Sequence, residues 1–227
     1  MELIYEGHAC FTVLCQGLRI LIDPYLSGNP LCKKKPQEMQ ADLILVTHGH
    51  SDHLGDALTI AKNTGATLVG QVDLFRALSV EGLNTVGFQF GGEYVHQGIR
   101  IRMTPAWHGN SVWTPSGYQY AGVACGYLIS DGKTTLYHAG DTCLFGDMKM
   151  VIAREPIHCA LLPIGGYFTM GPTDAACAAQ WLGADLVVPM HYNTFAQIQQ
   201  DPYAFAKLIE AQGQRCQVMR MGEQIEI

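Results

Sequence analysis

The stretch "THGHSDH" (Thr47–His53) places three histidines and one aspartate within seven residues. In an extended segment, side chains two residues apart point in the same direction, so His48 and His50 can bind one metal ion. Asp52 and His53 follow at the start of an expected helix, where the chain bends and these two can face a second ion. A helix cap explains one carboxylate at this place but not three imidazoles beside it. We therefore expect two adjacent metal ions.

Strand-like and helix-like runs alternate on both sides of this stretch. The run "ADLILVTH" (41–48) is almost uninterrupted in its apolar character, which is typical of a strand covered on both faces, and residues 53–65 have helical composition. Residues 84–141 are rich in strands, two of which are joined by a hairpin at Asp131-Gly132. The C-terminal third returns to alternation and ends in one strand over 215–227. This order predicts an α/β fold.

One sequence pattern occurs twice. "ADLILVTH" and "ADLVVPMH" (184–191) share their first three residues and end in a histidine at the same offset, His48 and His191. Both histidines would emerge at the end of a strand, where α/β sheets place their sites. Chance can supply such an echo, but we favour two related β/α halves that meet at a shared site.

Composition limits the classes of protein to consider. The 227 residues, 48% of them hydrophobic, provide one sizeable core, and no linker divides them, so we expect a single domain over residues 1–227. The formal net charge of −6 argues against nucleic acid as a partner. We interpret the basic run Lys33–Lys35 as a solvated loop, with attraction of anionic substrates as the alternative.

The sequence shows no sign of export or membrane insertion. Its N-terminus lacks a basic region followed by a long apolar stretch, and no run approaches the roughly 18 to 20 apolar residues of a membrane span. The eight cysteines form no C-x-x-C pair, so we expect mostly reduced, buried thiols. Cys143 is interpreted as a buried thiol, with a place in a pocket wall as the alternative. We expect a cytoplasmic protein without a membrane partner.

The heptapeptide resembles the H-x-H-x-D-H signature of the metallo-β-lactamase superfamily. The resemblance extends along nearly the whole chain, because Asp23 in "LIDP", His108 in "TPAWHGN", Asp141 in "YHAGDT" and His191 in "VVPMHYNT" match its other motifs in order. It implies an α/β (α+β) protein with a four-layer αββα sandwich. The site would then lie at the strand ends between the two sheets.

The resemblance also implies a set of metal ligands and their supporting residues. Carried over residue by residue, the ligands are His48, His50 and His108 for one ion, Asp52, His53 and His191 for the other, and Asp141 as a bridge. Asp52 and Asp141 would be the catalytic carboxylates. Asp23 and His8 would orient the ligand histidines by hydrogen bonds, with an ordinary strand-end role as an equal alternative for His8. We expect a structural role for His138.

The ligand set favours hydrolysis. Imidazoles with a bridging carboxylate suit zinc or manganese, with iron as a further option. Two such ions can share a water, lower its pKa and present it as hydroxide to a small ester, lactone or phosphoester. The related flavodiiron proteins carry Glu where this chain has His50, so hydrolysis is favoured over reduction of oxygen or nitric oxide.

Three longer motifs narrow the resemblance. "GDTCLFGDM", "LLPIGGYFTMGPTDA" and "PMHYNTF" are similar to a group of small metal-dependent hydrolases that mostly lack an assigned substrate and resemble L-ascorbate-6-phosphate lactonase. We expect Tyr167 and Thr169 in the glycine-rich segment, and Tyr192 and Asn193 next to His191, to contact a small-molecule substrate. A glycine-rich loop before a helix can bind phosphate, so an anionic substrate is one option, although a structural turn explains the glycines equally well.

Two other functions compete with this one. A nuclease is the first, because nucleic-acid-processing members share the heptapeptide, but the acidic balance and the lack of a sizeable insertion speak against it. A non-catalytic metal-binding or ligand-sensing module is the second, and the complete ligand set lowers its weight. A homo-oligomer is expected by resemblance only.

Overall fold

The computed structural model describes residues 1–78 and 80–227, and within them the strands form two large sheets and a small hairpin. The strands of the first sheet are β1 (Glu2–Gly7), β2 (Cys10–Cys15), β3 (Leu18–Ile22), β4 (Leu43–Leu45), β5 (Thr67–Gln71), β6 (Thr85–Phe88) and β16 (Gln224–Glu226). Those of the second are β7 (Glu93–His96), β8 (Ile99–Pro105), β11 (Cys125–Ser130), β12 (Thr135–His138), β13 (Cys159–Pro163), β14 (Leu186–Met190) and β15 (Arg215–Cys216). The hairpin consists of β9 (Ser111–Thr114) and β10 (Gly117–Tyr120).

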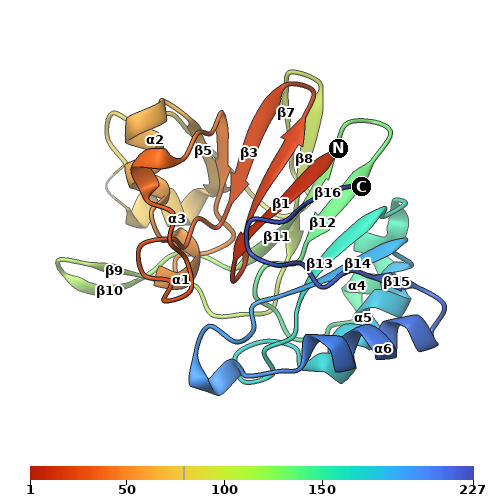
Figure 1. The fold of residues 1–227 in the computed structure, drawn as a ribbon. Coiled ribbons are helices and arrows are strands. Elements are labelled where there is room, and N and C mark those ends of the chain that lie inside the picture. The colour runs from red at the N-terminus through yellow and green to blue at the C-terminus, as the bar shows by residue number, and fades with distance from the viewer. Residues whose placement is uncertain (79) are drawn as a thin grey trace.

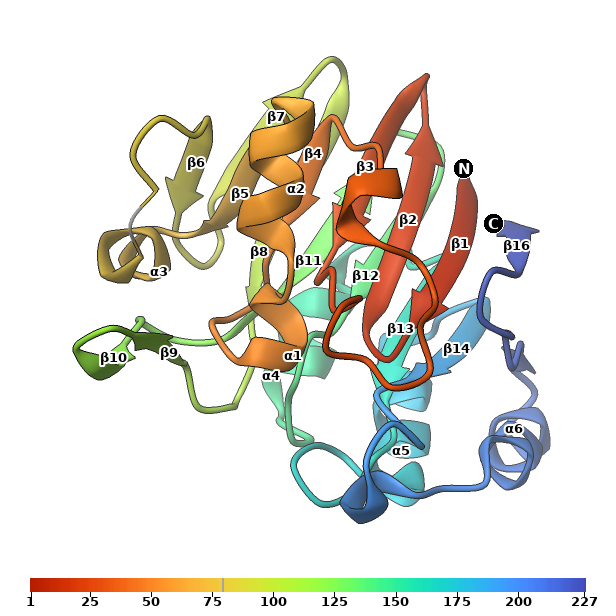
Figure 2. The same cartoon turned by 60° about the vertical axis from the view of Figure 1, so that its left-hand side comes forward.

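Helices cover the outer faces of the two sheets (Figure 1). Those beside the first sheet are α1 (Ser51–Leu54), α2 (Ala57–Thr64), α3 (Val72–Ala77) and the 3₁₀ turn η1 (Pro36–Glu38). Those beside the second are α4 (Asp147–Met150), α5 (Pro172–Leu182), α6 (Pro202–Ala211) and the 3₁₀ turns η2 (Ile152–Arg154) and η3 (Ala196–Ile198). Figure 2 shows α2 lying against β5. The expected four-layer αββα order is confirmed.

The apolar run before the heptapeptide forms a strand with both faces buried. Leu43 and Leu45 of β4 belong to the core cluster between the sheets, whereas Ile44 packs into the second cluster, under α2. This follows from the alternation of side chains along a strand. Each such side chain contributes about 1.5–3 kcal/mol on burial. The run therefore fixes β4 in the middle of two apolar layers.

Both sheets follow the same plan. In the first, β1, β2 and β3 are antiparallel and β3 to β6 are parallel. In the second, β8, β11 and β12 are antiparallel and β12 to β15 are parallel. The two halves are thus similar, but the echoed segments do not correspond in position: 41–48 supplies β4, directly beside β3, whereas 184–191 supplies β14, which β13 separates from β12.

Two predicted elements differ from those observed. The helix expected over 53–65 is broken at Gly55 (φ 43°), where a Cβ would lie 2.3 Å from the carbonyl oxygen of Pro24. The single strand expected over 215–227 is wrong, since β15 and β16 pair in different sheets. The chain turns between them at Gly222, whose N–H donates to the carbonyl of Tyr5 at 2.7 Å. The C-terminal strand thereby pairs with β1 next to the N-terminus (Figure 2).

Among the residues described, no helix is long and apolar enough to cross a membrane.

Candidate metal centre

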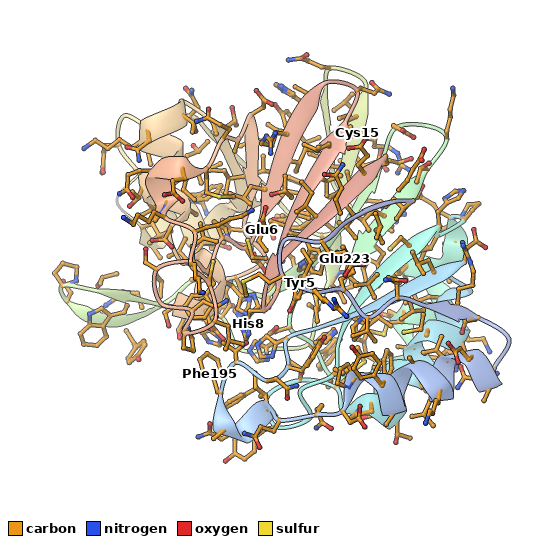
Figure 3. The ribbon with its side chains drawn as sticks, viewed as in Figure 1. Tyr5, Glu6, His8, Cys15, Phe195 and Glu223 are labelled. Atoms are coloured by element: carbon orange, nitrogen blue, oxygen red, sulfur yellow. The ribbon has the colours of Figure 1, made fainter. Side chains whose placement is uncertain are left out.

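Nine polar side chains with metal-binding or supporting chemistry gather at one edge of the sandwich. They come from segments that follow β1, β3, β4, β8, β12 and β14, and they are His8, Asp23, His48, His50, Asp52, His53, His108, Asp141 and His191. Figure 3 shows His8 at the end of β1 with Phe195 nearby, and their ring centroids are 5.4 Å apart. All seven residues expected as ligands therefore lie together, with the two expected supporting residues beside them.

Three imidazoles form the first group. The Nε2 atoms of His48 and His108 lie 3.0 Å and 3.3 Å from Nδ1 of His50. Nitrogen ligands in a tetrahedral site at about 2.1 Å from a metal are roughly 3.4 Å apart, so the spacing fits one ion. Burial lowers the pKa of all three histidines. They are therefore neutral, which is the form that donates a lone pair to a metal.

The second group consists of Asp52, His53 and His191. The Nε2 atoms of the two histidines lie 3.9 Å and 3.6 Å from Oδ2 of Asp52. Asp141 reaches both groups, because Oδ1 is 3.2 Å from His53 Nε2, and Oδ2 is 3.0 Å from His191 Nε2 and 3.6 Å from His108 Nε2. Its carboxylate thus lies between the two groups.

Several buried atoms at this place lack a hydrogen-bond partner among the described residues. They are Nε2 of His53, both ring nitrogens of His191 and Oδ1 of Asp141. A buried polar atom left without a partner costs about 1–3 kcal/mol. His53 Nε2 and Asp141 Oδ1 are only 3.2 Å apart and still make no hydrogen bond. A cation that accepts both lone pairs accounts for this arrangement.

Charge at the centre supports the same conclusion. Burial alone would raise the pKa of Asp141, but His191 and His53 hold the pKa well below its usual range. Burial alone would lower the pKa of His191, but Asp141 and Asp52 raise the pKa to about 9. The ionised carboxylates therefore attract positive charge to this position, and protons compete with a metal ion for it.

Asp23 determines which nitrogen of two ligand histidines faces the centre. Thr47 donates its backbone N–H and its hydroxyl to the Asp23 carboxylate at 2.8 Å and 2.6 Å. Since the hydroxyl hydrogen is used, Thr47 Oγ1 accepts the Nδ1–H of His48 at 3.0 Å. The Nδ1–H of His53 donates to Asp23 Oδ2 at 2.7 Å. Both histidines are left with an Nε2 lone pair directed into the centre.

His8 forms a hydrogen bond with the carboxylate of Asp52. Its Nδ1 is 2.9 Å from Thr194 Oγ1 and its Nε2 is 3.2 Å from Asp52 Oδ2. In the tautomer that satisfies both contacts, the threonine hydroxyl donates to Nδ1 and Nε2–H donates to Asp52. Burial lowers the pKa of His8 to about 4, so the ring is neutral. The contact with Asp52 is the one that the orienting role of His8 needs, and that role stays a prediction.

The backbone is strained where the strands deliver these residues. His8, Asp23 and His191 adopt left-handed backbone conformations, with φ of 59°, 45° and 55°. Such conformations cost about 1–3 kcal/mol for non-glycine residues and cluster at functional sites. The His191 N–H donates to the His8 carbonyl at 2.9 Å, which ties the end of β14 to the end of β1. The two sheets are therefore joined at the site itself.

Two supporting residues act on the loops rather than on the ligands. His138 accepts the Gly140 N–H at Nδ1 and donates from Nε2 to the Ala9 carbonyl at 2.9 Å, which fits the structural role expected for it. Asn110, which the sequence reasoning missed, accepts the Gly49 N–H at 2.8 Å and donates to the Ala121 carbonyl at 2.7 Å. Its place two residues after His108 was the only available signal.

The four expected substrate contacts lie outside the walls of the cavity above the centre. That cavity, of about 450 Å³, is lined by Tyr25, His50, Ser51, Asp52, His108, Asp141, Phe168, His191, Phe195 and Gln197. Tyr167 points to solvent, and the Thr169 hydroxyl donates to the Met170 carbonyl. Tyr192 packs on the core and Asn193 accepts the Gln200 N–H. Phe168 and not Tyr167 lines the cavity, within a turn in which the Gly166 N–H donates to the Met170 carbonyl at 3.0 Å.

The cysteines and the basic run are also placed. All eight cysteines are free, and Cys143 is exposed and lines no cavity described here, contrary to expectation. Lys34 forms an ion pair with Glu6 at 2.5 Å, and the Glu6 side chain is almost fully buried. The basic run is therefore partly structural.

The fold and the cluster together are those of a metallo-hydrolase, and comparison with known proteins agrees. A family model described as a beta-lactamase superfamily domain matches residues 2–191. The chain is 43% identical to a UPF0173 metal-dependent hydrolase of Anoxybacillus flavithermus and 45% identical to one of Pelotomaculum thermopropionicum, over the full length of both chains in each case.

A solved structure is also similar. Igni18, described as a metallo hydrolase from Ignicoccus hospitalis, superposes with a TM-score of 0.89 and is 36% identical, covering 99% of this chain and 97% of its own. The chain belongs to the metallo-β-lactamase superfamily and, within it, to the UPF0173 metal-dependent hydrolases. The similarity to L-ascorbate-6-phosphate lactonase stays a prediction.

Proposed function

We propose that this metal-dependent hydrolase uses two divalent metal ions to cleave a small ester, lactone or phosphoester. The observation that carries the proposal is the position of Asp141, whose carboxylate lies 3.2 Å and 3.0 Å from the Nε2 atoms of His53 and His191 in one group and 3.6 Å from that of His108 in the other. A carboxylate within reach of both groups of nitrogen donors is suited to bridge two adjacent ions.

The residues present fit such a pair. His48, His50 and His108 would hold one ion, Asp52, His53 and His191 the other, and Asp141 both. Zinc or manganese suits these donors best, with iron as a further option. When bound, two such ions supply Lewis acidity and a water of lowered pKa.

Asp52 and Asp141 are distinguished by their exposure. The Asp52 side chain is 21% exposed and lines the cavity, whereas that of Asp141 is 3% exposed. Burial raises the pKa of Asp52, but His53, His191 and His8 together hold it well below its usual range, so the Asp52 carboxylate is ionised where it faces the cavity. Both carboxylates are placed to bind the metal ions, and that of Asp52 is the more exposed to a substrate in the cavity.

The test is a panel of carboxylic esters, lactones and phosphodiesters, assayed after reconstitution with zinc, manganese or iron. Asp141→Ala and His50→Ala should each lower kcat/KM at least 100-fold. His96→Ala, on the edge strand β7 where the ring contacts Tyr94, is the matched control and should leave the rate unchanged. Equal rates in Asp141→Ala and the wild type would place the activity elsewhere.

The competing functions find no support in the site. The described residues that line the cavity include no Lys or Arg to hold a phosphate backbone, which disfavours a nuclease. A cavity that opens to the proposed ions is what turnover needs, and the activity panel decides between an enzyme and a module without turnover. A homo-oligomer, a cytoplasmic location and the absence of nucleic-acid and membrane partners stay predictions.

A further inference from the structure

A second cavity, of about 580 Å³, adjoins the one above the metal centre. The two share His50, Ser51, Asp52 and Phe168 as walls. The remaining walls of the second cavity come from α1 with its flanking residues and from the β9–β10 hairpin, and they are Gly49, Leu54, Gly55, Ser111, Val112, Trp113 and Tyr118. A molecule whose reacting bond lies at Asp52 can therefore extend into this second cavity.

Three aromatic side chains, those of Trp113, Tyr118 and Phe168, line the second cavity. Trp113 and Tyr118 are directly paired across the hairpin, with ring centroids 4.9 Å apart in an edge-to-face arrangement. Phe168, from the loop after β13, lines the same cavity, and its ring centroid lies 4.7 Å from that of Tyr167. Trp113 and Tyr118 are 67% and 73% exposed, so the protein itself covers little of their apolar surface. Figures 1 and 2 both show the hairpin projecting from the body of the protein.

The charge of the walls defines the kind of group that fits. Among the described residues, neither cavity is lined by Lys or Arg, and both are lined by the carboxylate of Asp52. Lys34, from the basic run, already forms an ion pair with Glu6. An anionic group seated against the hairpin would find no cationic side chain there, whereas a neutral ring could pack against the aromatic side chains that line the cavity.

We propose that Trp113, Tyr118 and Phe168 form a binding site for an uncharged aromatic group of the substrate. This assignment rests on the proposed function, since it places the reacting bond at the metal centre. It narrows the substrate to a neutral aromatic ester or lactone, and it argues against a substrate that is anionic at the end remote from the reacting bond.

The first experiment compares three esters with the metal-loaded enzyme: methyl phenylacetate, methyl acetate and methyl 4-carboxyphenylacetate. We expect kcat/KM for methyl phenylacetate to exceed that for each of the others by roughly 10- to 100-fold. Methyl acetate lacks the ring, whose burial is worth several methylene groups, and the carboxylate of methyl 4-carboxyphenylacetate finds no Lys or Arg among the described walls of the cavity. Trp113→Ala and Tyr118→Ala should each reduce this preference at least fivefold. Tyr120→Ala, an exposed aromatic of the same hairpin outside the cavity walls, is the control and should keep it.

The second experiment measures binding without turnover. Calorimetric titration of the metal-loaded protein with 2-phenylacetamide should show binding that acetamide lacks. Tyr118→Phe, which keeps the ring, should retain the binding, and Tyr118→Ala should lose it. Retention by the conservative variant separates loss of the site from misfolding.

The outcomes separate the two proposals. Ester hydrolysis without any preference for the ring overturns the aromatic site and leaves the hydrolase. Binding of 2-phenylacetamide that depends on Tyr118, without hydrolysis of any ester, supports the aromatic site and overturns the proposed reaction. A change of sedimentation from dimer to monomer in Trp113→Ala, with the preference intact, identifies the hairpin as an interface between copies and overturns the aromatic site.

Discussion

Replacement of Asp23 by Asn tests the network that directs the ligand histidines. The Asp23 carboxylate is fully buried and accepts three hydrogen bonds, two from Thr47 and one from His53. An amide keeps one oxygen, which can still accept the Thr47 N–H, but its NH₂ group then faces Thr47 Oγ1 and His53 Nδ1. To accept a hydrogen bond from that NH₂ at Nδ1, His53 must carry its proton on Nε2. If Thr47 Oγ1 accepts from the NH₂ instead, its hydroxyl turns and donates to His48 Nδ1, so His48 must also carry its proton on Nε2.

The size of the effect follows from the number of ligands that change. An outer hydrogen-bond partner is typically worth 10–100-fold in metal affinity. Because Asp23 orients two histidines, we expect Asp23→Asn to weaken metal binding roughly 100-fold, which equals about 2.8 kcal/mol at 1.4 kcal/mol per factor of ten.

Competition of the protein with a chelating dye for zinc measures this change. Asp131→Asn is the control, because Asp131 accepts the N–H groups of Lys133 and Thr134 in a hairpin on another part of the fold. The control should lose some stability but bind zinc as the wild type does. Wild-type affinity in a folded Asp23→Asn variant would refute the reasoning.

Three further predictions concern the loops and the pH dependence. Asn110→Ala leaves the Gly49 N–H and the Ala121 carbonyl without their partner, so the free energy of unfolding should fall by about 2–3 kcal/mol in urea titrations, and an unchanged value would contradict the role of Asn110. His138→Ala removes the contacts to Ala9 and Gly140 and should lower stability by about 2–4 kcal/mol in thermal unfolding, whereas a change below about 0.5 kcal/mol would refute it. In chelator-treated protein the pKa of His191 is raised to about 9 from an ordinary value near 6.5. Its contribution to the free energy of unfolding is therefore complete below about pH 6.5 and is lost as the pH rises through about 9, while zinc affinity rises over the same range. Stability and zinc affinity that both stay constant between about pH 6.5 and 9 would exclude this coupling.

Sequence patterns predict the fold and the site correctly where a single physical requirement determines the residue types. Residues 41–48 must bury both faces of a central strand, so their apolar character identifies β4, and a dense set of imidazoles in Thr47–His53 has no structural use that competes with metal binding. The motif residues that follow other strands converge because strand ends meet at one edge of the sandwich.

The failures also have physical causes. The β9–β10 hairpin exposes Trp113 and Tyr118, so it shows no alternation between buried and exposed positions that would reveal it as strand. Tyr167 and Phe168 are neighbouring aromatic residues in one turn, so their residue types do not reveal that Phe168 lines the cavity and Tyr167 is exposed. The change of sheet within 215–227 depends on the pairing of β16 with β1, which no local pattern encodes.

The central claim is that Asp141 joins two metal sites, and the metal content per chain tests it most directly. Protein purified without chelator from cells supplied with zinc and manganese should contain about two ions per chain by mass spectrometry. His108→Ala should retain about one, because Asp52, His53, His191 and Asp141 are intact, and Asp141→Ala should retain fewer than one. A wild-type content of one ion or less, unchanged in Asp141→Ala, would contradict the account.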